Sequence, residues 1–263
     1  MESPRAVLTL LMMMIGSATS FQSSAPCPLL ARHRHRPSST TSPLRAASQQ
    51  PNELFDSPGW EGIKQELDQV PVFAVSNAQG HPVKYSLEKK DETFEVPLFY
   101  IFATDAMKEL EKAKEQNTSL PGMDINPYPL GGIFEMWAKD GAVIVPNKQS
   151  IISAGAPPNA NPIGQQVPLF ACMEIAQEDE KGKPVLPLFF DLEDANNAVS
   201  QAVNLDGGKE ADFEVVGLNL PEAVSLLANA KDDATAFHFI PPTSSLEHIR
   251  DYLSGGSPPP PPL

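Results

Sequence analysis

Two blocks of the chain repeat the same order of apolar and polar segments. Gln69–Ala74 reads QVPVFA, and Gln166–Ala171 reads QVPLFA. In each block this apolar phrase is followed by a polar turn, which contains Gly80 or Gly182, and then by a short extended segment. An apolar strand, a glycine-containing turn and an extended return are typical of a β-hairpin. The pattern therefore predicts a hairpin at the beginning of each block.

A strand and a helix follow the predicted hairpin in both blocks. The continuous apolar run Pro97–Phe102 predicts a strand that is covered on both faces. After it, Ala106, Leu110 and Ala113 recur at helical spacing among charged residues, which predicts an amphipathic helix. Leu186–Ala202 repeats this strand and helix in the second block, and acidic residues at both helix starts suit the helix dipole.

The last third of each block repeats more loosely. Ile125–Met136 parallels Phe213–Val224 as a strand, a turn and a helix, with Gly131 and Gly132 expected in the first turn. A further strand then ends in proline and leads to a final helix in both blocks. We therefore predict an α/β (α+β) fold made by tandem duplication of a hairpin-strand-helix-strand-helix-strand-helix module. Halves of about 85 residues are small for separate cores, so we expect them to pack as a pseudo-two-fold pair.

Composition divides the chain into seven segments. They are a signal peptide (1–20), a transit peptide (21–46), a helical lead-in (47–69), the first half (70–154), a linker (155–166), the second half (167–253) and a Gly/Pro-rich tail (254–263). The linker is rich in Pro, Gly and Asn, and the lead-in predicts an amphipathic helix around Glu61–Val70. The proline run of the tail predicts a polyproline II segment, which is either solvated or bound by a proline-recognising partner.

The first fifty residues have the composition of a targeting leader. Ala6–Ile15 is a short apolar run behind Arg5, followed by small residues, as in a secretory signal peptide. Residues 21–52 contain no acid and are rich in Ser, Thr, Pro and Arg, as in a transit peptide. Phe21 directly follows the predicted cleavage point, and in this the leader resembles those of algae with secondary plastids. We therefore expect a plastid protein, with final processing near residues 44–47.

Charge is distributed unevenly along the chain. Residues 1–50 carry a net charge of +4, and the remainder carries −18. A body this acidic repels phosphate groups, so we expect no nucleic-acid partner. The sequence contains no run of eighteen apolar residues, so we expect no transmembrane segment and at most peripheral membrane association. Cys172 remains alone after loss of Cys27 with the leader, which leaves no intramolecular disulfide; an apolar strand surrounds it and predicts a buried thiol.

Candidate catalytic chemistry is sparse in the sequence. His81, His238 and His248 are isolated from one another, at spacings that fit no metal site. The nucleophile elbow, the phosphate-binding loop and the dinucleotide-binding glycine motif do not occur. We therefore expect no catalytic residue, no bound metal, no cofactor and no enzymatic activity. An enzyme with a cleft between the halves stays open, because carboxylate chemistry leaves little trace in a sequence.

Three phrases resemble the Tic22-like family. Val70–Phe73 and Val167–Phe170 open the two halves, and Pro187–Ala195 reads PLFFDLEDA, similar to a phrase of that family. The resemblance extends over residues 60–253, although the first half keeps only the Asp-Ala of this phrase and carries a long charged insert at Ser86–Glu95. The family is a component of the import translocon (Tic complex) of the chloroplast inner envelope.

The resemblance implies a soluble protein-import factor of the plastid envelope, working in the intermembrane space. It implies a chaperone-like binder of unfolded preproteins and their transit peptides, next to other translocon components. The stroma and the periplastid compartment are alternative locations. A structural translocon subunit without client binding is the alternative function. An acidic body suits basic transit peptides, because opposite charge speeds encounter and apolar contact then supplies affinity.

The resemblance also implies an apolar groove in each half, for which we select four candidate residues. They are Ile133, Phe134, Met136 and Trp137. Four large apolar groups in five positions exceed what one buried helix face needs, and Met and Trp suit adaptable binding surfaces. Packing in the core is the alternative interpretation of the same residues.

Overall fold

A computed structural model describes residues 54–89, 92–116, 122–178, 184–206, 213–228 and 236–254. These residues belong to one compact unit, Gln49–Leu263, which is separate from Met1–Ser48. The expected signal peptide, transit peptide and leader residue Phe21 lie outside the described residues, as does the tail beyond residue 254.

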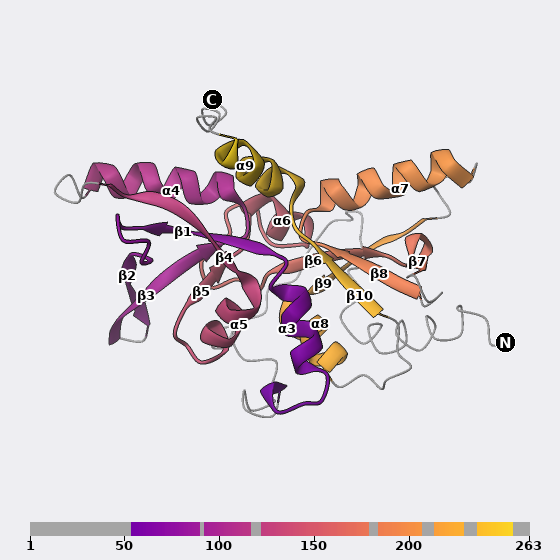
Figure 1. Ribbon diagram of the computed structural model, residues 1–263, viewed down its shortest axis with the longest axis horizontal. Coiled ribbons are helices and arrows are strands. Elements are labelled where there is room, and N and C mark those ends of the chain that lie inside the picture. Colours follow the sequence, from indigo (N-terminus) through magenta and orange to yellow (C-terminus); the bar gives the residue numbers. More distant parts are fainter. Residues whose placement is uncertain are drawn as a thin grey trace, which may run out of the picture. The chain divides into compact units, whose positions relative to one another are not determined.

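Strands and helices follow one another along the described chain, and the strands form two mixed sheets (Figure 1). The first part comprises α3 (Trp60–Leu67), β1 (Pro71–Ser76), β2 (Lys84–Lys89), β3 (Glu92–Tyr100), α4 (Ala103–Gln116), β4 (Asp124–Pro129), α5 (Leu130–Ala138), β5 (Val143–Val145) and α6 (Lys148–Ser153). The second comprises β6 (Pro168–Cys172), the 3-10 helix η1 (Met173–Ile175), β7 (Gln177–Glu178), β8 (Pro184–Phe189), α7 (Leu192–Asp206), β9 (Val215–Asn219), α8 (Leu220–Ala228), β10 (Ala236–Ile240) and α9 (Thr243–Leu253). The predicted mixed α/β class is confirmed.

The strands of the two sheets are paired in the same way. In the first sheet β1 lies antiparallel to β3 and β4, and β3 lies parallel to β5. In the second sheet β6 lies antiparallel to β8 and β9, and β8 lies parallel to β10. Pro71 and Pro168 begin β1 and β6, where the missing N–H is tolerated.

The hairpin expected after β1 is confirmed at its turn, where the N–H of Asn77 donates to the carbonyl of His81 (3.0 Å) and that of Val83 to the carbonyl of Val75 (2.8 Å). The segment after the Gly80 turn meets β1 only at the bridge between Ser76 and Pro82. It then continues as β2, which pairs antiparallel with β3 from Lys84–Pro97 to Lys89–Glu92. One edge of β1 is covered by β4 over its full length, and on the other edge β3 pairs at Phe73 and the returning segment at Ser76. In the second half β7 likewise pairs with β8, and the Gly182 turn lies outside the described residues.

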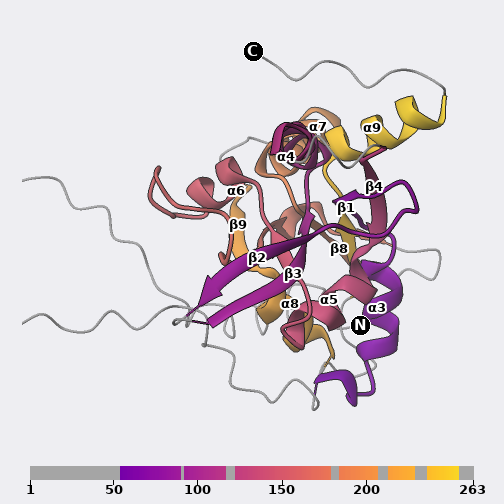
Figure 2. The same cartoon turned by 90° about the vertical axis from the view of Figure 1, so that its left-hand side faces the viewer.

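Helices cover the sheets on two sides. Figures 1 and 2 show α4, α7 and α9 on one side of the strands and α3, α5 and α8 on the other. The predicted inward stripe of α4 is confirmed, because Ala106, Leu110 and Ala113 are buried in one cluster with residues of β1, β3 and β4. The predicted double cover of β3 is also confirmed at Leu98, Phe99 and Tyr100, which are buried.

The lead-in forms α3, which packs against both α5 and α8. The approach to α5 is close at Gly131, where a Cβ atom would lie 2.5 Å from Asp68 Oδ1 and 2.7 Å from the carbonyl oxygen of Lys64. The expectation that Gly131 and Gly132 form a turn is therefore wrong. Both lie in the first turn of α5, which follows β4 directly, because the missing side chain at Gly131 is needed where α3 crosses.

Candidate functional site

The four candidate residues of α5 divide between the core and the surface. Ile133 and Phe134 are buried, with exposed fractions of 7% and 1%, and Met136 is 41% exposed. Trp137 is half-buried. Helix α5 contacts α3 on one side and β5 on another, so two of its large residues enter the core while the other two reach solvent.

A row of aromatic rings connects α3 with the exposed end of α5. The ring centroids of Phe55 and Trp60 are 4.9 Å apart, and those of Trp60 and Phe134 are 5.9 Å apart. Phe134 is in turn 5.4 Å from Trp137. Tilted and edge-on aromatic contacts at these distances are favourable. Trp137 therefore stands at the end of a row that reaches the buried rings of Phe134 in α5 and Trp60 in α3.

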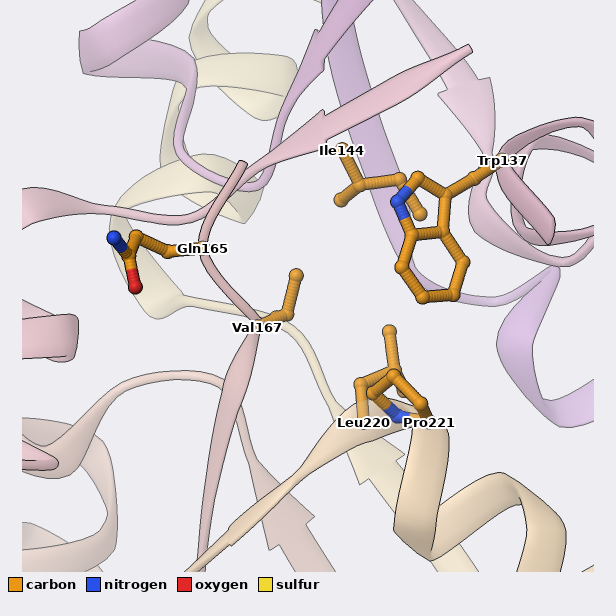
Figure 3. Close-up of a pocket in the computed structure, with 6 residues that line it drawn as sticks. All are labelled: Trp137, Ile144, Gln165, Val167, Leu220 and Pro221. Atoms are coloured by element: carbon orange, nitrogen blue, oxygen red, sulfur yellow. The ribbon is translucent and has the colours of Figure 1, made fainter. Parts of the chain in front are cut away.

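Beside Trp137 lies a small apolar depression between the two halves (Figure 3). Its lining residues are Trp137, Ile144, Gln165, Val167, Leu220 and Pro221. Its cavity volume is about 10 Å³, room for about one water molecule. Sites for small molecules usually measure about 300 to 1,000 Å³, so the depression is a shallow apolar surface and not a pocket for a cofactor.

The depression has a buried floor and a partly exposed rim. Ile144, Val167 and Leu220 are buried and form the floor. Trp137, Gln165 and Pro221 are partly exposed, and Figure 3 shows the indole of Trp137 across from Leu220 and Pro221. The surface is therefore apolar at the bottom, with the Gln165 amide as a hydrogen-bonding group at its edge.

Of the six lining residues, only Trp137 is among the candidate residues that the sequence predicts. Leu220 begins α8 as Leu130 begins α5, and the N–H of each donates to the carbonyl of the residue just before the first strand of its half. These bonds run from Leu220 to the carbonyl of Val167 (2.8 Å) and from Leu130 to that of Val70 (3.0 Å). The repeated pattern could thus have pointed to Leu220. Ile144 and Gln165 carried no such signal.

The described histidines lie apart from one another. His81 is exposed, and His238 Nδ1 lies 2.9 Å from Glu66 Oε2. The ring of His248 packs edge-on against Phe73, with 5.9 Å between centroids. Within the described ranges, no group of three or more His, Cys, Asp or Glu residues is placed so that it could hold a metal ion.

The thiol of Cys172 is buried, as the sequence predicts. Burial, with a smaller effect of the hydrogen bond to Glu174, raises the pKa of the Cys172 thiol to about 11. A thiol with this pKa stays protonated near neutral pH and is a poor nucleophile. The arrangement therefore offers apolar binding at the depression and no activated thiol in β6.

The sequence and the fold both match one protein family. Residues 19–251 match the family described as the Tic22-like family. The chain belongs to this family. Comparison with curated proteins found no match.

Two solved structures of Tic22 proteins share the fold. Tic22 from Plasmodium falciparum is 19% identical with a TM-score of 0.59, over 74% of this chain and 99% of that one. Tic22 from Anabaena, described as a protein-transport protein, is 20% identical with a TM-score of 0.55, over 76% of this chain and 99% of that one.

The Asp-Ala pairs that resemble the family phrase have a structural role in this Tic22-like protein. Ala106 and Ala195 are fully buried. Asp105 Oδ2 accepts a hydrogen bond of 2.7 Å from the side chain of Asn147, the N-cap of α6. Asp194 Oδ2 accepts one of 2.9 Å from the backbone N–H of Thr243, the first residue of α9. Each aspartate thus links the start of one helix to the start of another.

Proposed function

We propose that this Tic22-like protein is a protein-import factor of the plastid envelope that binds unfolded preproteins in transit. The observation that carries the proposal is the half-buried Trp137 at the rim of an apolar depression. Aromatic side chains at the edge of an apolar hollow are frequent binding anchors. An apolar side chain of an extended client segment would pack against the indole of Trp137, over this shallow depression.

Charge supports a basic client. The chain has a net charge of −14, although its first fifty residues are basic. Transit peptides are basic and partly apolar, so electrostatic attraction would speed their encounter with the acidic body. Burial of their apolar side chains at the depression would then supply affinity.

We propose the envelope intermembrane space as the place of action. The predicted bipartite leader and the membership in the Tic22-like family support a plastid address. In the part of the chain that the structure describes, no helix is long and apolar enough to cross a membrane.

We propose that the chain arose by tandem duplication and that its two halves are related by pseudo-two-fold symmetry. Three repeated features support it. They are the strand pairings, the backbone hydrogen bonds that Leu130 and Leu220 donate, and the side-chain hydrogen bonds that Asp105 and Asp194 accept. On this interpretation the starts of α5 and α8 are equivalent, and a client could use related surfaces in both halves.

The two tryptophans of the chain allow a direct test. In a Trp60→Phe variant, Trp137 is the reporter, and we expect its emission to shift to shorter wavelength when a basic transit peptide is added. In the matched Trp137→Phe variant, buried Trp60 should report little change. Trp137→Ala should weaken peptide binding about tenfold, the loss typical of a binding anchor. Binding that leaves the emission of Trp137 unchanged and tolerates Trp137→Ala would place the client elsewhere.

Brief crosslinking in the native cells separates this function from that of a structural subunit. Unprocessed precursors with basic leaders among the crosslinked proteins would support client handling. Recovery of translocon proteins without any precursor would instead support a structural role.

A further inference from the structure

The outward face of α7 differs from that of α4, the helix at the corresponding place in the first half. Three lysines of α4, Lys108, Lys112 and Lys114, each pair with the acid three residues earlier, at 3.2, 3.4 and 3.5 Å. In α7 no charged residue occurs from Ala195 to Leu205. A fully solvated helix face usually carries charges of both signs, as α4 does.

The exposed residues of this uncharged stretch define what we term the α7 face. They are Asn196, Asn197, Ser200, Gln201, Asn204 and Leu205. Leu205 is 85% exposed. The side-chain amide and hydroxyl groups of this face have no hydrogen-bond partner among the described residues.

The composition of the α7 face suits an interface. Asn and Ser form helices less readily than Lys and Glu, which would be favoured if only helix formation mattered at these positions. Depletion of charged residues together with an exposed large apolar group is typical of the centre of a protein–protein contact.

We propose that the α7 face is where two copies of this chain associate, with their α7 helices antiparallel about a two-fold axis near Ser200. In a two-fold contact the same patch meets itself. A charged patch would then face its own charge, whereas an amide both donates and accepts hydrogen bonds and complements itself. In a chain with a net charge of −14, an uncharged face is also where two copies approach with the least repulsion.

The geometry predicts a weak dimer that leaves the client site open. A helix of 15 residues is about 22 Å long, so one helix pair buries less surface than a permanent dimer does. Figures 1 and 2 show α7 on the opposite side of the strands from α5 and α8, which carry lining residues of the depression. Loss of the dimer would therefore leave peptide binding at Trp137 unchanged.

Sedimentation velocity of the full-length chain over a wide concentration range tests the proposal. We expect a concentration-dependent dimer, and we expect Ser200→Arg to raise its dissociation constant about tenfold or more, as expected for a central interface position. The matched control is Glu111→Arg, which stands at the same place after the Asp-Ala pair in α4 and should leave the dimer intact. A protein that stays monomeric throughout, or a dimer that tolerates Ser200→Arg, would overturn the proposal.

A cysteine pair gives a second readout that does not depend on the tolerance of arginine. In a Cys27→Ser background, Ser200→Cys should form disulfide-linked dimers under mild oxidation, because the two thiols would meet near the axis. Glu111→Cys should not, and buried Cys172 should stay reduced in both variants. Equal crosslinking of the two variants would show random collision and would contradict the α7 contact.

Discussion

The side chain of Ser245 in α9 lies against the first residue of α4, Ala103. Its Oγ accepts a hydrogen bond of 3.2 Å from the backbone N–H of Ala103 and lies 3.3 Å from the carbonyl oxygen of Ile101, to which it donates. Ser245 is fully buried. The first N–H groups of a helix have no partner inside that helix, so α9, which belongs to the second half, supplies one for a helix of the first half.

Ser245→Ala should destabilise the protein by about 1 to 2 kcal/mol, because it leaves a buried helix N–H without an acceptor. Urea unfolding followed by circular dichroism measures this change. Ser244→Ala is the matched control, since Ser244 is exposed, and it should change stability by less than about 0.5 kcal/mol. Equal effects of the two substitutions would mean that the Ser245 bonds contribute nothing.

Gly131→Ala and Gly132→Ala should change the free energy of unfolding in opposite directions. A Cβ at Gly131 would lie 2.5 Å from Asp68 Oδ1, whereas one at Gly132 would meet nothing within 4 Å. We expect the first substitution to cost about 2 kcal/mol or more by forcing α3 away from α5. The second should stabilise by up to about 1 kcal/mol, because alanine favours the helix. Thermal unfolding of both variants measures the difference, and a stabilising Gly131→Ala would refute the close helix contact.

Phe134→Ala and Met136→Ala should differ strongly in their effect on stability, because Phe134 lies in the core and Met136 on the surface. Phe134 is 1% exposed, and its truncation should cost about 3 to 5 kcal/mol through the cavity that it leaves. Met136 is 41% exposed, and its truncation should change the free energy of unfolding by less than about 0.5 kcal/mol. A large cost at Met136 would show that this side chain is packed in solution.

Cys172 should react slowly with alkylating reagents while the protein is folded. With a pKa of about 11, its thiolate fraction at mildly alkaline pH is roughly a hundredfold lower than that of an ordinary cysteine. In a Cys27→Ser variant, we expect labelling to accelerate by about this factor or more in concentrated urea. Equal rates in the native and unfolded protein would show that β6 opens freely.

Stability should fall as the pH rises above about 9. Burial raises the pKa of Cys172 to about 11 and that of Tyr85 to about 12, and it also raises the pKa of Tyr100. These are acids whose folded-state pKa lies above the unfolded one, so the unfolded chain loses its protons first and becomes favoured. Urea midpoints measured across the alkaline range should decrease steadily, and a Tyr85→Phe variant should decrease less. A midpoint independent of pH would contradict the burial of these groups.

The sequence alone determined the elements whose signal lies within one short window. The stripe of Ala106, Leu110 and Ala113 predicted the buried face of α4, because helical periodicity is a local property. Pro71 and Pro168 marked strand beginnings, because proline lacks an N–H wherever it occurs. The repeated order of segments likewise predicted a mixed α/β fold, which the structure and the family membership bear out.

Only the tertiary structure decided which edges and faces are covered. The strand after Gly80 leaves β1 after a single bridge and pairs with β3, and no local pattern records which strand is its partner. Phe134 is buried and Met136 is exposed because α3, a segment outside both repeats, brings Trp60 to one side of α5. The depression beside Trp137 depends on residues from both halves and the linker. Its position follows from how distant segments pack, which the order of residues along the chain does not contain.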